Sequence, residues 1–143
     1  MTPQQFAARL LAEPAHAGLY RCAPGWVQDS AEILWRPLAA APIAREPLLA
    51  ALGTALAFPA YYGQNWDAAW DCLTELDWPA GRLLALRLPL APGCAVDEAA
   101  LEVFLELLDD ACRHWAEQGR ALCLLLETRR EDLSCLRALP MLE

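Results

Sequence analysis

Ala121-Leu-Cys-Leu-Leu-Leu126 is a nearly continuous apolar run whose length suits one β-strand. An apolar run without alternating polar residues is typical of a strand covered on both faces, as in parallel sheets. It follows the clearest helical pattern in the chain, in which apolar residues recur with i, i+3, i+4 spacing between Leu101 and Trp115. Asp97 is placed to cap the start of this helix and Gly119 to end it. A helix that leads directly into a buried strand predicts an α/β fold.

Two further apolar runs predict strands earlier in the chain. They are Ile33-Leu-Trp35 and Leu83-Leu-Ala-Leu-Arg-Leu88. A helical pattern opens at Glu46-Pro47 and ends near Phe58. Strands separated by helices pair in parallel through right-handed crossovers. We therefore expect a small layer of parallel strands packed with helices.

The two ends of the chain lie outside this pattern. Thr2-Pro3 begins a short predicted helix that runs to about Leu11. The stretch from Pro14 to Ser30 is rich in proline and glycine, and Leu19-Tyr-Arg-Cys22 is its only strand candidate. We interpret this stretch as an appended segment, and we assign no structure to the tail after residue 127.

The composition indicates one folded domain with an acidic surface. The chain has 143 residues, of which 57% are hydrophobic, so it can bury a core. Its net charge of −8 opposes binding to nucleic acids and to anionic membranes, and favours a basic protein partner. The first residues do not form a signal peptide and no stretch suits a membrane span. A cytoplasmic location is therefore expected.

The six cysteines do not predict a metal site. They lie far apart, with no Cys-x-x-Cys pair and no Cys/His ligand spacing. Cys112 and Cys123 fall inside apolar helical and strand patterns, where a free cysteine behaves as a small hydrophobic residue. We expect reduced core thiols, no metal and no cofactor.

A helix predicted from the Asn65 cap to about Leu76 carries an acidic stripe. At about 100° per residue, Asp67, Asp71 and Glu75 fall on one side together with Thr74. The opposite, apolar side is formed by Ala69, Cys72, Leu73 and Leu76. Like charges four residues apart destabilise a helix by about 0.2–0.5 kcal/mol per pair, and no arginine follows until residue 82. The stripe is either a solvated surface of an acidic protein or a binding surface.

Aromatic residues beside the stripe favour a binding surface. Trp66 and Trp70 border it, and tryptophan beside depleted lysine is typical of binding hot spots. Trp66 lies nearer the apolar side, so Trp70 is the better candidate for a surface contact. Tyr61 and Tyr62 precede the helix and serve either packing or contact, and Gly63 is expected to supply a turn conformation that other residues resist.

The segment Tyr61-Tyr-Gly-Gln-Asn-Trp-Asp-Ala-Ala-Trp-Asp-Cys-Leu-Thr74 resembles the signature of the barstar family, which inhibits guanyl-specific ribonucleases of the barnase type. The resemblance extends over residues 32–127 and leaves residues 1–31 as an N-terminal extension packed on the domain and residues 128–143 as a tail. It implies a three-stranded parallel sheet packed with helices. It also implies that the acidic helix and the preceding loop occlude the active site of the enzyme, with Asp71 as the central acid.

The predicted contact set combines residues matched to the family with neighbours chosen from the helix itself. Its members are Tyr61, Asn65, Asp67, Trp70, Asp71, Thr74 and Glu75. A carboxylate held rigidly in a site that binds phosphate pairs with the arginine, lysine or histidine found there.

Two departures from the family leave the mode of recognition open. After Thr74 the family has Gly-Trp, whereas this chain has Glu75-Leu76. A later acid of the family aligns with His114, and Asp110, one turn earlier, is a possible substitute.

Other functions are less well supported by the residues. No nucleophile with its base, no metal cluster and no phosphate-binding glycine loop is present, so the chain is not expected to be an enzyme. The main alternative is a barstar-like module or immunity protein for a different basic toxin or regulatory partner. Repulsion between acidic stripes argues against a homodimer, and a monomer is expected in the free state.

Overall fold

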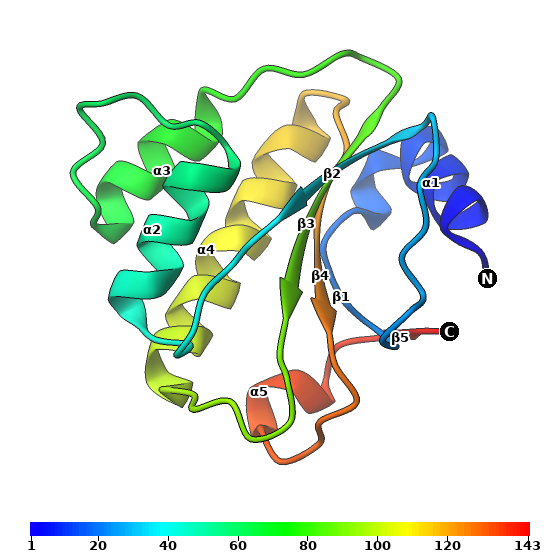
Figure 1. Ribbon diagram of the computed structural model, residues 1–143. Helices are drawn as coiled ribbons and strands as arrows, with labels where there is room; N and C mark the ends of the chain where they lie inside the picture. Colours follow the sequence, from blue (N-terminus) through cyan, green and yellow to red (C-terminus); the bar gives the residue numbers. More distant parts are fainter.

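The computed structural model describes residues 1–143 and contains a five-stranded sheet in which every pairing is parallel (Figure 1). The strands lie in the spatial order β2-β3-β4-β1-β5. Their bounds are β1 Leu19–Cys22, β2 Ile33–Pro37, β3 Leu83–Pro89, β4 Leu122–Glu127 and β5 Met141–Leu142. The alternation of strands with helices therefore gives the parallel α/β fold expected from the sequence.

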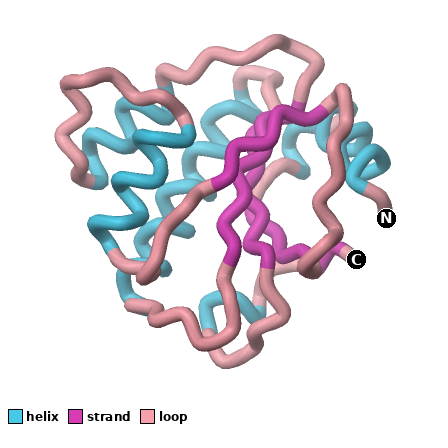
Figure 2. Tube along the Cα trace, in the orientation of Figure 1, coloured by secondary structure: helices cyan, strands magenta, loops and turns pink.

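Helices cover both faces of the sheet (Figure 2). One layer is formed by α2, α3 and α4 together with the short α5, and α1 covers the other face. The helices are α1 Pro3–Ala12, α2 Arg45–Ala55, α3 Trp66–Thr74, α4 Glu98–Glu117 and α5 Ser134–Arg137, and the 3-10 turn Pro14–His16 follows α1. None of these helices is long and apolar enough to cross a bilayer.

The two central strands divide the core into two parts. Leu84 and Leu86 of β3 and Leu124 of β4 face α2, α3 and α4, within a cluster of 24 buried residues. Ala85 and Leu125, which alternate with them, face α1 within a second cluster of 14 buried residues. The near-continuous apolar composition of β4 thus arises because both of its faces are covered.

The predicted three-stranded sheet is wrong in strand number, because both ends of the chain add a strand. Leu19 of β1 pairs with Leu124 of β4, and Arg21 of β1 pairs with Met141 of β5. β1 coincides with the strand candidate Leu19–Cys22, whereas the two-residue β5 is too short to show a periodicity in the sequence. Phe6 of α1 packs edge-on against Tyr20 of β1, with ring centroids 5.0 Å apart, which joins the first helix to the enlarged sheet.

The interior cysteines lie in both parts of the core, and all six cysteines are free. Cys22 and Cys123 are buried under α1, and Cys112 of α4 is buried in the larger cluster. Burial raises the pKa of Cys22 to about 12 and also raises the pKa of Cys112. Their thiols stay protonated and serve as packing groups.

Candidate functional site

The start of α3 is fixed by a side-chain cap. The Asn65 carboxamide oxygen accepts a hydrogen bond from the Ala68 amide at 2.8 Å, which satisfies one of the free donors of the first turn. Gln64, with φ of 49°, takes the left-handed conformation that the sequence had assigned to Gly63. Gly63 instead leaves room for the Asn65 side chain, whose nitrogen would lie 3.3 Å from an added Cβ. Asn65 therefore positions the helix.

Tyr62 anchors the loop before α3 to α2. Its hydroxyl donates to the Leu49 carbonyl at 3.0 Å, and its ring packs edge-on against Phe58 at 4.9 Å between centroids. Burial raises the pKa of Tyr62 to about 12, so the donor keeps its proton. Gly53 of α2 allows this approach, because a Cβ there would lie 3.0 Å from the tyrosine ring. Tyr61, by contrast, is 77% exposed. The two tyrosines therefore differ in role, one packed and one presented to solvent.

The inward side of α3 is formed by Ala69, Cys72 and Leu73, which are buried as the predicted periodicity requires. The helix ends at Thr74, two residues before the predicted end. The Glu75 amide donates to the Cys72 carbonyl at 3.2 Å, which tightens the last turn and stops the helix. The residue that departs from the family motif therefore lies at the C-terminal end of α3.

Trp115 of α4 connects the two helices that carry the site. Its indole nitrogen donates to the Leu73 carbonyl of α3 at 2.9 Å. Its ring packs edge-on against buried Trp78, with centroids 4.9 Å apart. The Arg120 guanidinium lies 4.4 Å from the centre of the Trp78 ring and donates to the Trp78 carbonyl. These contacts hold α3 in one position against α4.

The outward side of α3 presents carboxylates without cationic partners. Asp67, Asp71 and Glu75 are all exposed. The three arginine–carboxylate ion pairs of the structure involve Asp109, Glu127 and Asp132, and the His16 ring contacts Glu13. The Thr74 hydroxyl donates to the Asp71 carbonyl at 3.0 Å and lies within the same surface. Asp67 and Asp71 on α3 and Glu75 at its C-cap are therefore exposed carboxylates without a cationic partner.

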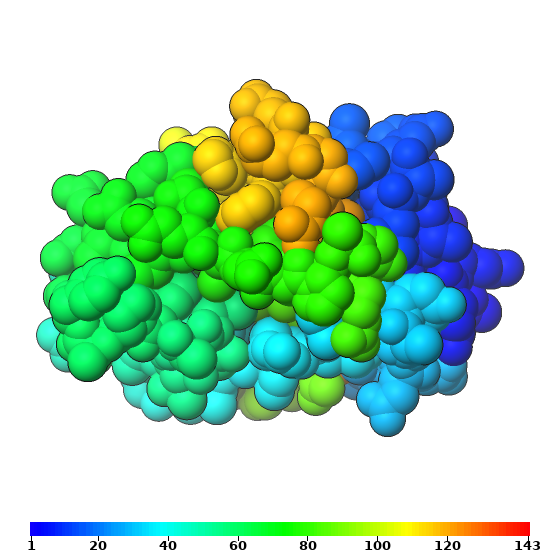
Figure 3. Space-filling model, turned by 90° about the horizontal axis from the view of Figure 1, so that it is seen from above, coloured from blue at the N-terminus to red at the C-terminus, as the bar shows by residue number.

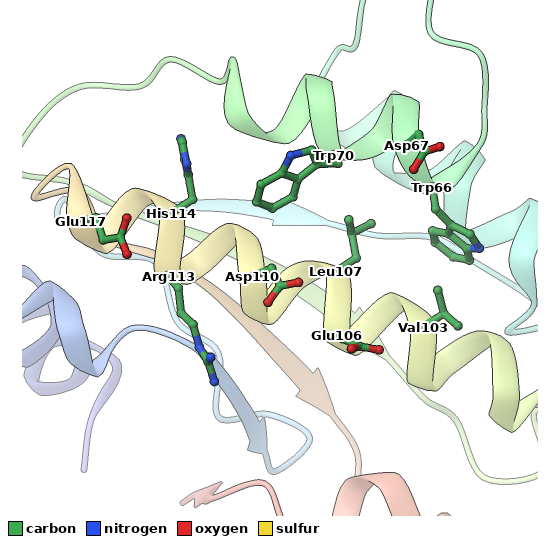
Figure 4. Close-up of a pocket in the computed structure, with 10 residues that line it drawn as sticks. All are labelled: Trp66, Asp67, Trp70, Val103, Glu106, Leu107, Asp110, Arg113, His114 and Glu117. Carbon is green, nitrogen blue, oxygen red and sulfur yellow. The ribbon is translucent and has the colours of Figure 1, made fainter.

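Trp70 is half-buried and points from α3 toward α4 (Figure 4). Its ring lies edge-on to His114 at 6.0 Å between centroids. His114 occupies the position at which the family resemblance implied an acid, and it points out from α4 beside Trp70. The two aromatic side chains border the acidic surface on the side of α4.

A groove of about 650 Å³ runs between α3 and α4. Figure 4 shows Leu107 directed from α4 toward α3, while Asp110 and Arg113 extend from the other side of α4. Its lining includes two of the predicted contact residues, Asp67 and Trp70, but not Asp71. In Figure 3 the green surface of α3 and its flanking loops lies beside the orange end of α4 and away from the blue N-terminal segment.

Of the groove residues on α4, only Asp110 and His114 were singled out from the sequence, and Val103, Glu106, Leu107, Arg113 and Glu117 were not. Val103 is 42% exposed although it is apolar, and exposed Glu106 lies one turn beyond Glu102. Glu102, Glu106 and Asp110 repeat the i, i+4, i+8 acidic spacing of α3, and this repeat was the available signal.

Residues 40–127 match the family model described as Barstar (barnase inhibitor). The chain belongs to the barstar family. No curated protein sequence matches the chain significantly. Members of the barstar family are inhibitors rather than enzymes, which indicates that this chain acts by binding. The matched region contains α2, α3, α4 and the two strands β3 and β4.

Proposed function

We propose that this protein inhibits a basic, guanyl-specific ribonuclease by placing the outer surface of α3 and the preceding loop in the active site of the enzyme. The single observation that carries the proposal is the set of unpaired carboxylates on the exposed side of α3. Enzymes that cleave RNA bind phosphate with cationic side chains, so a carboxylate in that position forms charge-assisted hydrogen bonds with them.

The rigidity of α3 supports the proposal. Asn65 caps the helix, and Trp115 fixes its last turn against α4. A surface that is already ordered loses little conformational entropy on binding. Little of the favourable contact free energy is therefore offset by the cost of ordering the surface.

Asp71→Ala tests the role of the central acid. Removal of a hot-spot side chain costs about 2–4 kcal/mol, which corresponds to an increase of about 30-fold to 1,000-fold in the inhibition constant. The assay is inhibition of a barnase-type ribonuclease by the purified protein at several inhibitor concentrations. Asp29→Ala is the matched control, because Asp29 is exposed and lies in the loop before β2. An inhibition constant that is the same for Asp71→Ala and for the parent refutes the placement of Asp71 in the active site.

Salt dependence supplies a second measurement on the same complex. Added salt screens the attraction between an acidic inhibitor and a basic enzyme and slows their association. We expect the association rate to fall as salt is raised, and a constant rate would contradict an encounter driven by the acidic surface.

A second function, binding of a different basic toxin or regulatory partner, is favoured by Glu75 and His114. Glu75 adds a charge at the end of α3, and His114 replaces an acid beside Trp70. A parent protein that fails to inhibit the ribonuclease at equimolar amounts supports this second function over the first.

A further inference from the structure

The groove between α3 and α4 has an aromatic and aliphatic lining with acidic margins. Trp66 and Trp70 line it from α3, and Val103 and Leu107 line it from α4. Trp66 and Trp70 also pack against the main core, so their position is set by the fold. Part of each ring remains exposed and contributes to the groove lining. A surface groove that combines apolar side chains with a few charged groups is a candidate site for a partner or ligand.

The charged residues of the groove are almost all negative. Its carboxylates come from Asp67 on α3 and from Glu106, Asp110 and Glu117 on α4. None of the four forms an ion pair. Arg113 is the one arginine in the lining, and it pairs with Asp109 at 2.9 Å. The groove therefore offers charge and apolar contact together.

We propose that this groove binds a cationic segment of the partner protein, with arginine or lysine side chains, at a place separate from the surface of Asp71. The aliphatic stems of these side chains can pack against Leu107 and Val103. Their charged ends can pair with the carboxylates and lie over the tryptophan rings. The groove is continuous with the α3 surface through Asp67 and Trp70, so one partner can occupy both. The groove then determines which basic partner is preferred.

A second copy of this chain is a poor occupant of the groove. The chain has a net charge of −8, and the surface around the groove repels a like surface.

The proposal rests on the proposed function for the identity of the partner, so two probes are used with the full chain. The first is a barnase-type ribonuclease, with affinity measured by calorimetry. Glu106→Arg reverses a groove charge, and we expect it to raise the dissociation constant about tenfold or more. Glu131→Arg makes the same change at an exposed position outside the groove and is expected to raise the constant less than about twofold. Asp71→Ala reports on the α3 surface in the same experiment.

The outcomes separate the two ideas. If Asp71→Ala weakens ribonuclease binding and Glu106→Arg does not, the groove proposal is refuted and the proposed inhibitor function is retained. If Asp71→Ala and Glu106→Arg both weaken ribonuclease binding and Glu131→Arg does not, the groove proposal is supported.

The second probe is an octa-arginine peptide titrated into the isotopically labelled protein. This titration tests the groove proposal even if the ribonuclease does not bind. We expect the indole N–H signals of Trp66 and Trp70 to shift, and Glu106→Arg to weaken this binding about tenfold. Trp26, whose indole donates to the Met1 carbonyl at 2.9 Å, serves as the internal control. Equal shifts at Trp26 and Trp66, or a concentration-dependent dimer that buries the groove, overturn the proposal.

Discussion

Replacing Gly53 with alanine has two opposing effects on the free energy of unfolding, and the size of each is known. In the interior of a helix, alanine is more favourable than glycine by about 0.5–1 kcal/mol. The new methyl group, however, would lie 3.0 Å from two carbons of the Tyr62 ring. The outcome depends on whether this ring can move.

The contacts of Tyr62 indicate that it cannot move at low cost. Its hydroxyl is bonded to the Leu49 carbonyl at 3.0 Å, and its ring packs against Phe58. Overpacking of such a site costs about 1–3 kcal/mol, which exceeds the gain in helix propensity. We expect Gly53→Ala to lower the free energy of unfolding by about 1 kcal/mol and Tm by about 3 °C.

Urea denaturation and thermal unfolding measure the change, and a double-mutant cycle identifies its cause. In the Tyr62→Ala background the ring is absent, so Gly53→Ala is expected to stabilise the protein by about 0.5–1 kcal/mol. The coupling between the two sites is then about 2 kcal/mol. A single Gly53→Ala variant that is more stable than the parent would refute the claim that Tyr62 is held rigidly.

Two further predictions concern the thiols and the C-terminal segment. We expect Cys94 and Cys135, which are partly exposed, to react with Ellman's reagent in the folded protein, whereas Cys112 and Cys123, which are fully buried, react only after unfolding. Burial raises the pKa of Cys135 as well, so Cys135 is expected to react slowly. Peptide mass spectrometry identifies the labelled residues, and labelling of Cys123 without denaturant contradicts the described core. The Glu98 carboxylate accepts hydrogen bonds from the Ser134 hydroxyl at 2.7 Å and amide at 2.9 Å, and the hydroxyl bond is the first cause of its lowered pKa. A lowered pKa in the folded state means that the stabilisation is present above the ordinary glutamate pKa of about 4.3 and is lost as the pH falls through the folded value. The stability difference between parent and Glu98→Gln, measured by urea denaturation, should therefore shrink between about pH 5 and pH 3, and an equal difference at both ends would exclude a charge-dependent contact.

The longer elements were predictable because their signals are local. The apolar spacing from Leu101 to Trp115 gave α4, and the apolar run that begins at Ala121 gave β4. Asn65 and Asp97 act as the caps that their positions predicted. Each of these features depends on residues within one or two turns of each other.

What the sequence did not predict depends on contacts between distant segments. β5 forms only because Arg21 of β1 lies opposite Met141, and nothing near residue 141 indicates this. The groove requires the packing of α3 on α4, which the indole of Trp115 secures through the Leu73 carbonyl. The acidic spacing of α4 was present in the sequence, but only the packing places Glu106 in the same groove as Trp66.

The position of β1 between β4 and β5 makes the order of synthesis important. β1 is made early, yet it cannot pair until Leu122–Glu127 has emerged, because its partner is β4. Until then, or in a chain shortened to the family region, β4 is an edge strand of leucine and cysteine without a neighbour on one side. Exposed apolar edge strands pair with other molecules and aggregate. By pairing with β4, the N-terminal segment removes an exposed apolar edge, and we expect it to reduce aggregation.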